Sequence, residues 1–126
     1  MSHPSSANVY GIPNCDTVKK ARDWLSAAGV GYEFHDFKKA GVPDAALADW
    51  LQALGWEAVL NRKGTTWRKL DAALQATVTD AASAAAVMRD YPSLVKRPVV
   101  RWPNGRISVG FSPAQFAALQ GASSSA

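Results

Sequence analysis

At 126 residues the chain has the length of one domain, and its 48% hydrophobic and 19% charged residues are typical of globular proteins. It contains no apolar run near the roughly 20 residues that span a bilayer, and its first residues lack the basic and apolar segments of a signal peptide. The single cysteine excludes an internal disulfide and favours a reducing compartment, so we expect a cytoplasmic protein with no membrane partner.

The net charge of +4 is unevenly distributed along the chain. Residues 1–54 contain 5 basic and 6 acidic residues, whereas residues 55–126 contain 9 basic and 4 acidic ones. The positive half indicates either an ordinary solvated surface or a site for anionic groups. Because the basic residues come in pairs rather than in one long stripe, we expect no nucleic-acid partner.

The first 37 residues predict a strand, a turn, a helix and a second strand. Residues 8–12 are a short β-type run that ends in turn residues. The helix that follows ends before Gly29, and its apolar face consists of Val18, Ala21, Leu25 and Ala28. Residues 32–37 alternate aromatic and polar side chains, as half-buried strands do. The two strands of such a βαβ unit should be parallel.

The middle of the chain, residues 41–92, predicts a helical insert. Its first helix is expected to have Pro43 at its first helical position. Residues 56–74 predict two short helical pieces, the second capped by Thr66. Thr79 is expected to cap a further, alanine-rich helix.

The end of the chain predicts a β-hairpin and a closing helix. The hairpin is centred on Asn104-Gly105, a strong short-range hairpin signal. Ser112 is a good N-cap for the closing helix, with Pro113 at the first helical position and Gln115 at the third.

The order β-α-β, helical insert, β-hairpin, α predicts an α/β protein with a four-stranded mixed sheet, which is the thioredoxin-like architecture. We expect one domain over residues 8–120. Residues 1–7 and 121–126 are small and polar, and we expect them to be disordered tails.

Cys15 lies where the first strand gives way to the first helix. The unpaired N–H groups of a helix start stabilise a thiolate, and cysteines there commonly have a pKa lowered from about 8.5 to roughly 3.5–7.5. Lys19 would add positive potential, whereas Asp16 opposes it. The alternative is an inert cysteine in the core, but the neighbouring residues Asn14, Asp16 and Thr17 are polar.

The thiol has no partner within its own motif, because the positions three residues away are Ile12 and Val18. A redox cycle must therefore take its second thiol from another molecule, with glutathione the obvious small candidate. His35 has no further His, Cys or paired carboxylate at ligand spacing, so we expect neither a metal site nor a bound cofactor.

Several motifs in the chain are distinctive together: YGIPNCDTVKKARDWL, YEFHDF, LGWEAVLNRKGTTWRKLD, TDAASAAAVM and KRPVV. Over roughly residues 8–120 they resemble the arsenate reductase (ArsC)-related family, specifically its YffB branch, in the superfamily that also contains the Spx regulators. This resemblance implies a thioredoxin fold with a helical insert, in agreement with the order of elements.

The resemblance also implies roles for individual residues. Cys15 matches the nucleophile of glutathione- and glutaredoxin-coupled arsenate reductases, Arg97 an oxyanion-binding arginine, and Pro98 the cis-proline opposite the cysteine. A second anion-binding arginine falls at Arg62 or Lys63, whereas a third falls near Gly110, which argues against arsenate as the substrate. Residues expected to bind substrate or glutathione are Asn14, Lys19, Arg62, Lys63, Arg97 and Pro98.

These features predict a glutathione-dependent monothiol reductase, in which the Cys15 thiolate attacks an oxidised sulfur or an oxyanion. The expected partners are glutathione or another small thiol and a small disulfide or oxyanion, and the protein is expected to be a monomer. One alternative is an Spx-like regulator that binds RNA polymerase, although the C-x-x-C switch of that branch is absent. Another is a non-catalytic relic of the fold.

Overall fold

A computed structural model describes residues 6–124, and the side chains of residues 6–120. The chain divides into two compact units. The sheet unit consists of residues 1–36 and 97–126, and the helical unit of residues 37–96. The helical unit therefore includes the expected insert, residues 41–92, and extends it by four residues at each end.

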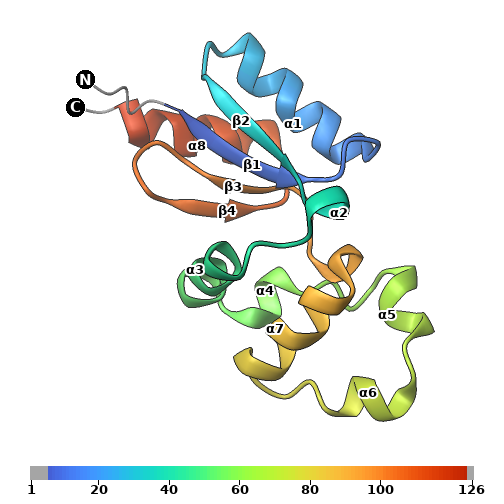
Figure 1. Cartoon of the computed structure of the whole chain (residues 1–126). Coiled ribbons are helices and arrows are strands. Elements are labelled where there is room, and N and C mark those ends of the chain that lie inside the picture. The colour runs from blue at the N-terminus through green and yellow to red at the C-terminus, as the bar shows by residue number, and fades with distance from the viewer. Residues whose placement is uncertain (1–5, 125–126) are drawn as a thin grey trace. The chain divides into compact units, whose positions relative to one another are not determined.

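The sheet unit contains a four-stranded mixed sheet in the order β2-β1-β3-β4 (Figure 1). Its strands are β1 (Ala7–Gly11), β2 (Tyr32–Asp36), β3 (Val99–Arg101) and β4 (Ile107–Val109). Strand β1 pairs with β2 in parallel, and β3 is antiparallel to both β1 and β4. This arrangement confirms the predicted parallel pair joined to a hairpin.

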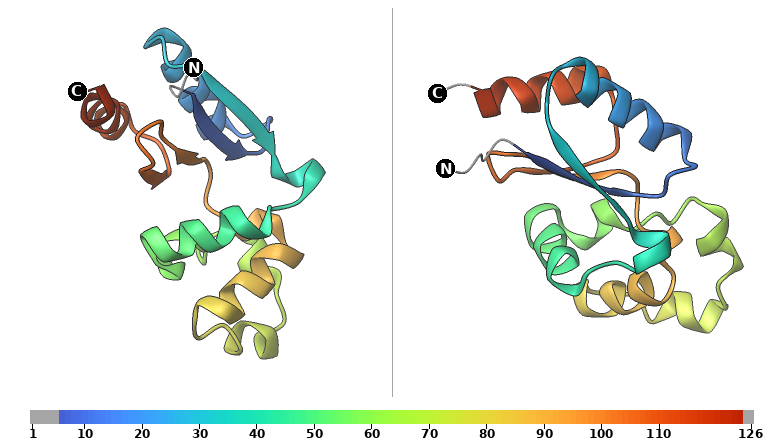
Figure 2. Two further views of the ribbon diagram at one scale, coloured as in Figure 1. Left: turned by 60° about the vertical axis from the view of Figure 1, so that its left-hand side comes forward. Right: turned by 45° about the horizontal axis from the view of Figure 1, so that its top comes forward.

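Two helices, α1 (Asp16–Ala27) and α8 (Pro113–Ser124), pack on the same face of this sheet (Figures 1 and 2). The alternation of strand side chains explains the packing, since one face of β1 is apolar and fully buried. The core cluster between the sheet and the two helices consists of Ala7, Val9, Ala21, Leu25, Val100, Trp102 and Phe116. Phe116 is its centre, with edge-on contacts to the rings of Trp24, Trp102 and Phe111.

Local signals end and begin the elements of the sheet unit much as predicted. Gly29 (φ 75°) follows α1, and the N–H groups of Gly29 and Val30 donate to carbonyls of the last turn, at 3.2 and 2.9 Å. Ser112 caps α8, because its Oγ accepts the N–H of Gln115 at 3.1 Å. In the hairpin only Gly105 has positive φ (88°), so Asn104 lies in the ordinary region and Gly105 supplies the left-handed residue.

The helical unit begins with α2 (Phe37–Ala40) and α3 (Asp44–Leu54), continues through α4 (Trp56–Val59), α5 (Thr65–Lys69), α6 (Ala72–Ala76) and α7 (Ala81–Asp90), and ends in the 3-10 turn η1 (Pro92–Leu94). Its large, fully buried side chains are Phe37, Leu47, Trp50, Val59, Leu60, Met88 and Leu94. An antiparallel bridge between Leu60 and Val95 ties its interior together.

Several expected boundaries in this unit differ from the structure. Pro43 is the N-cap of α3 and not its first helical residue. Thr66 lies inside α5, and the predicted second piece is two helices because Asp71 starts α6. The cap of α7 is Asp80 rather than Thr79, because the carboxylate of Asp80 accepts the N–H of Ser83 while the Ser83 hydroxyl accepts that of Asp80.

The expected disordered tails are shorter than predicted where the structure describes them. Ala7 is fully buried and pairs with Tyr32, so it belongs to β1. At the other end, α8 continues to Ser124. The rest of the two predicted tails, residues 1–5 and 125–126, lies outside the described residues.

Candidate active site

Cys15 is the N-cap residue of α1, at the end of the turn that follows β1. Its backbone is extended (φ −95°, ψ 126°), its N–H donates to the Ile12 carbonyl at 3.3 Å, and its own carbonyl accepts the N–H of Lys19 at 2.9 Å. The thiol is half-buried. The sulfur therefore stands beside the first turn of a twelve-residue helix and remains within reach of a reactant.

The environment of Cys15 favours the thiolate. Partial burial raises the pKa of the thiol, but the N–H of Val18, the guanidinium of Arg97 and the N–H of Thr17 together outweigh it and lower the pKa below its ordinary value. Arg97 acts both as a hydrogen-bond donor to the sulfur and through its charge. The half-buried Cys15 thiol thus ionises more readily than a free cysteine does, in surroundings typical of reactive rather than inert core cysteines.

The pairing of β1 with β3 explains why Arg97 reaches the sulfur. Val99 lies opposite Tyr10 in this antiparallel pair, so the residues just before β3 lie near the end of β1, which the Cys15 turn follows. Arg97 is half-buried, and the peptide bond between Arg97 and Pro98 is cis, as the resemblance implies. Pro98 is buried, and its carbonyl accepts the N–H of Gly110 at 2.9 Å.

Gly110 has positive φ (84°), and a side chain there would meet no neighbouring atom within 4 Å. The position is thus open in space, but its backbone lies in the left-handed region that favours glycine. Gly110 supplies no guanidinium at this position. Within the sheet unit, Arg97 and the backbone N–H groups of Val18 and Thr17 stabilise the negative charge of the Cys15 thiolate.

The remaining predicted site residues occupy two different parts of the chain. Asn14 and Lys19 are exposed on either side of Cys15 in the sheet unit, and Lys19 is not among the groups that lower the thiol pKa. Arg62 and Lys63 belong to the helical unit. There the Arg62 guanidinium lies 3.7 Å from a carboxylate oxygen of Glu57 and 5.4 Å from the centre of the Trp56 ring.

The N–H groups of Thr17 and Val18 lower the thiol pKa, although the Cys15 side chain forms no close cap hydrogen bond at the start of α1. The sequence predicted that N–H groups of the helix start act on the thiol, and the structure identifies these two. They occupy the second and third helical positions, counted from Cys15 as the cap. An N-cap side chain normally accepts a hydrogen bond from the N–H group at one of these two positions. Placing the cap at Cys15 would have been enough to identify both.

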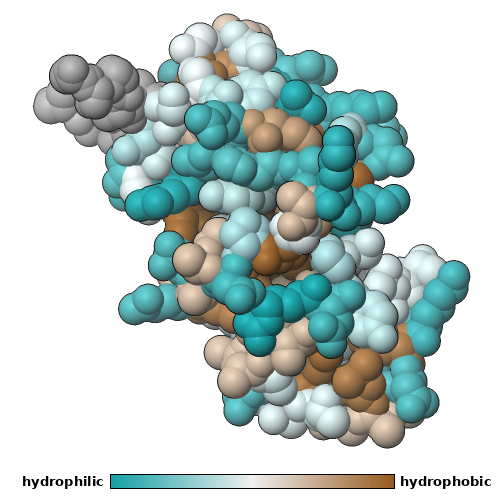
Figure 3. All heavy atoms as spheres, viewed as in Figure 1, coloured by the Kyte–Doolittle hydropathy of each residue, from teal (hydrophilic) through white to brown (hydrophobic). Residues whose placement is uncertain are grey.

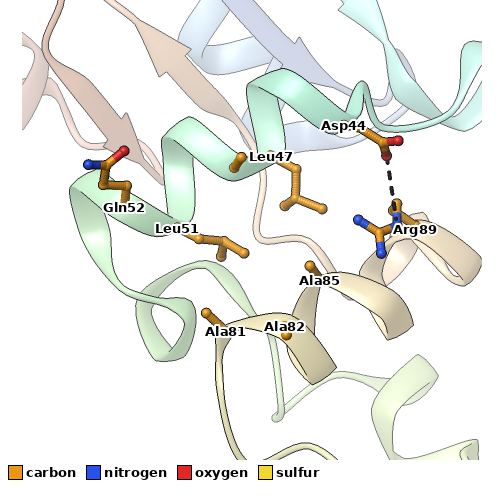
Figure 4. A pocket seen from close by; sticks show the side chains of 9 residues that line it. Asp44, Leu47, Leu51, Gln52, Ala81, Ala82, Ala85 and Arg89 are labelled. Carbon is orange, nitrogen blue, oxygen red and sulfur yellow. Dashed lines mark ion pairs between the residues drawn. The ribbon is translucent and has the colours of Figure 1, made fainter.

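The helical unit has a pocket of about 330 Å³ between α3 and α7 (Figure 4). Leu47, Leu51 and alanines of α7 line it, and an ion pair between Asp44 and Arg89 (3.7 Å) lies at one end. The pocket carries no nucleophile, so it offers no chemistry comparable to that of Cys15.

On the face shown in Figure 3, hydrophobic residues form separate small patches among hydrophilic ones.

Over residues 6–124, no group of three His, Cys, Asp or Glu side chains is placed to hold a metal ion. In the same range, none of the helices combines the length and the apolar character needed to cross a bilayer. His35 stacks on Tyr10 (4.5 Å between ring centres) and lies 2.9 Å from the side-chain oxygen of Asn8.

Comparisons with known proteins agree with this geometry. Solved structures of a YffB protein (48% identity, TM-score 0.83, covering 89% of this chain and 96% of the other) and of an arsenate reductase (ArsC) related protein from Brucella melitensis (47%, 0.70, 94% and 97%) are similar to it. An uncharacterized protein from Haemophilus influenzae is 36% identical over 87% of this chain and 95% of its own length. The global transcriptional regulator Spx of Streptococcus agalactiae is 26% identical over 88% and 80%.

The ArsC family model matches residues 10–119, which include Cys15, Arg97 and Pro98. The match covers most of both units, and the mixed sheet agrees with the solved relatives. The chain therefore belongs to the ArsC family.

Proposed function

We propose that this protein is a glutathione-dependent monothiol reductase whose nucleophile is Cys15. The observation that carries the proposal is the half-buried sulfur at the start of α1, where the N–H groups of Val18 and Thr17 and the guanidinium of Arg97 lower the thiol pKa. A lowered pKa increases the thiolate fraction at any pH below the ordinary cysteine value, and it also makes Cys15 a better leaving group in the second step.

The reaction proceeds through a mixed disulfide. The Cys15 thiolate attacks one sulfur of an oxidised substrate, the S–S bond of the substrate breaks, and the displaced thiolate leaves with the electron pair. When the substrate is a glutathione mixed disulfide, Cys15 then carries glutathione. A second glutathione thiolate attacks that glutathione sulfur, which releases oxidised glutathione and regenerates the Cys15 thiolate. Each turnover consumes one free glutathione thiol per mixed disulfide, because the other half of the oxidised glutathione comes from the substrate.

An oxidised sulfur suits this site better than arsenate does. Disulfide exchange develops a single negative charge on the sulfurs, and one guanidinium with two N–H groups can stabilise it. Arsenate carries its charge on several oxygens and needs several donors, and the position matching a further arginine is Gly110. The oxyanion reaction is therefore the slower of the two in this proposal.

The test is a turnover assay with a glutathione mixed disulfide, reduced glutathione and a coupled readout of oxidised glutathione. We expect turnover by the wild type, none by Cys15→Ser, and a glutathione adduct of Cys15 in the mass spectrum before reductant is added. Arsenate in place of the disulfide should give much less product. A wild-type protein that forms no adduct and gives no more turnover than Cys15→Ser would contradict the proposal.

The similarity to Spx favours a second candidate, a regulator that docks on RNA polymerase. Against it, Ile12 and Val18 stand where a second cysteine would complete a thiol switch. Co-purification with purified RNA polymerase separates the two candidates, because a regulator binds the polymerase whether or not Cys15 is present. Such binding without any disulfide turnover would reverse the ranking.

A further inference from the structure

Gly11, the last residue of β1, is packed against the first turn of α1. A methyl group on Gly11 would lie 2.9 Å and 3.3 Å from the two terminal carbons of Val18, and 3.7 Å from a ring carbon of Phe34. The first distance is shorter than carbon atoms tolerate. Gly11 and Val18 are both buried, and Val18 is fully so, which leaves the contact no solvent to expand into.

Glycine at this position is used for its small size and not for its backbone freedom. The described glycines with positive φ are Gly29, Gly41, Gly55, Gly105 and Gly110, so Gly11 adopts a conformation open to any residue. Glycine weakens a strand interior and is found where another part of the chain must approach closely. Here the part that approaches is the turn of α1 that carries Val18.

We propose that Gly11 is a positioning residue for the Cys15 thiolate: without a side chain, it lets the first turn of α1 lie close to the end of β1, which fixes the N–H groups of Val18 and Thr17 beside Cys15. Val18 connects the two ends of this arrangement. Its side chain lies against Gly11, and its N–H is one of the groups that lower the pKa of Cys15. Gly11 itself does not contact the sulfur in this account and acts through Val18. The inference rests on the proposed function, because it concerns the same nucleophile.

The test is Gly11→Ala, read out by the pKa of Cys15. Since Cys15 is the only cysteine in the chain, a ¹³C label on its Cβ reports its ionisation without interference. The added methyl collides with the terminal carbons of Val18, whose β-branched and fully buried side chain has little room to rotate. We therefore expect the turn that carries the Val18 N–H to shift, so the pKa of Cys15 should rise and the thiolate population below that pKa should fall on the order of twofold. Gly31→Ala is the matched control, since Gly31 lies in the same unit without positive φ and its nearest neighbour is a Ser6 oxygen at 4.0 Å.

A second substitution tests the route through Val18. Removing its two terminal methyl groups with Val18→Ala makes room for the new methyl, so Gly11→Ala combined with Val18→Ala should bring the pKa of Cys15 back toward that of Val18→Ala alone. If Gly11→Ala does not fold, Val18→Ile adds bulk from the helix side of the same fully buried contact, and it should raise the pKa in the same direction.

The outcomes separate this inference from the proposed function. A folded Gly11→Ala or Val18→Ile protein with an unchanged Cys15 pKa overturns the positioning role, even when the variant is less stable. An equal rise in Gly31→Ala also overturns it. A wild-type Cys15 whose pKa is not lowered at all refutes the basis of the proposed function instead, and that result is obtained before any variant is made.

Discussion

Replacement of Arg97 by methionine tests the electrostatics of the site most directly. Methionine keeps much of the apolar stem of arginine but removes both the hydrogen bond to the sulfur and the positive charge. The pKa of Cys15 should rise, because the N–H groups of Val18 and Thr17 are then left to oppose the effect of burial.

The size of the effect follows from the partial exposure of the site. A hydrogen bond to a charged group contributes about 1.5–3 kcal/mol. The thiol is only half-buried and two N–H groups remain, so we take about 1 kcal/mol for the loss of thiolate stabilisation. At pH values below the pKa, this loss makes the thiolate population roughly fivefold smaller. The remaining thiolate is more nucleophilic, with a Brønsted coefficient of about 0.4–0.5, so the observed rate should fall only about two- to threefold.

The assay is the rate of reaction with 4,4′-dithiodipyridine, measured from pH 5 to 10. This disulfide carries no negative charge, so Arg97 does not attract the reagent itself. Arg97→Met should react about two- to threefold more slowly than the wild type at low pH and about twofold faster on the high-pH plateau, so that the two profiles cross. Arg101→Met removes an exposed arginine from the same unit and should leave the profile unchanged. Profiles of Arg97→Met and wild type that coincide would refute a role for Arg97 in stabilising the thiolate.

Three further predictions concern stability. The pKa of Cys15 is lower in the folded protein than in the unfolded chain, so between the folded pKa and about 8.5 the unfolded chain binds more protons. The free energy of unfolding of the wild type should therefore rise relative to that of Cys15→Ser as pH increases through this window. The advantage of the wild type should disappear as pH falls through the folded pKa. Ser108→Ala leaves the buried indole N–H of Trp102 without its 2.9 Å acceptor and should cost about 1–3 kcal/mol in urea unfolding, whereas the same substitution should cost much less when made in a Trp102→Phe variant, which has no indole N–H. Phe116→Ala should cost about 3–5 kcal/mol, against a much smaller loss for Phe116→Leu, because Phe116 is fully buried at the centre of the aromatic contacts; equal losses for the two variants would contradict that packing.

Boundaries that depend on one strong local residue were predictable. Gly29 after α1 and Ser112 before α8 act through hydrogen bonds with their own neighbours, so their roles could be inferred from the sequence. Asp80 was missed because Thr79 and Asp80 are both good caps, and the reciprocal bonds with Ser83 decide between them. The short helices α5 and α6 have no fully buried residues, so their apolar pattern was too weak to show the break between them.

The sequence by itself determined the order of strands and helices and the place of Cys15 at a helix start, because hydrophobic periodicity and capping act between residues a few positions apart. Only the tertiary structure decided which distant groups meet the sulfur. Arg97 is far from Cys15 along the chain, and the antiparallel pairing of β3 with β1 brings it there. The contact between Gly11 and Val18 likewise depends on how closely α1 packs against the strand end, a distance set by the whole core beneath them and by no single local pattern.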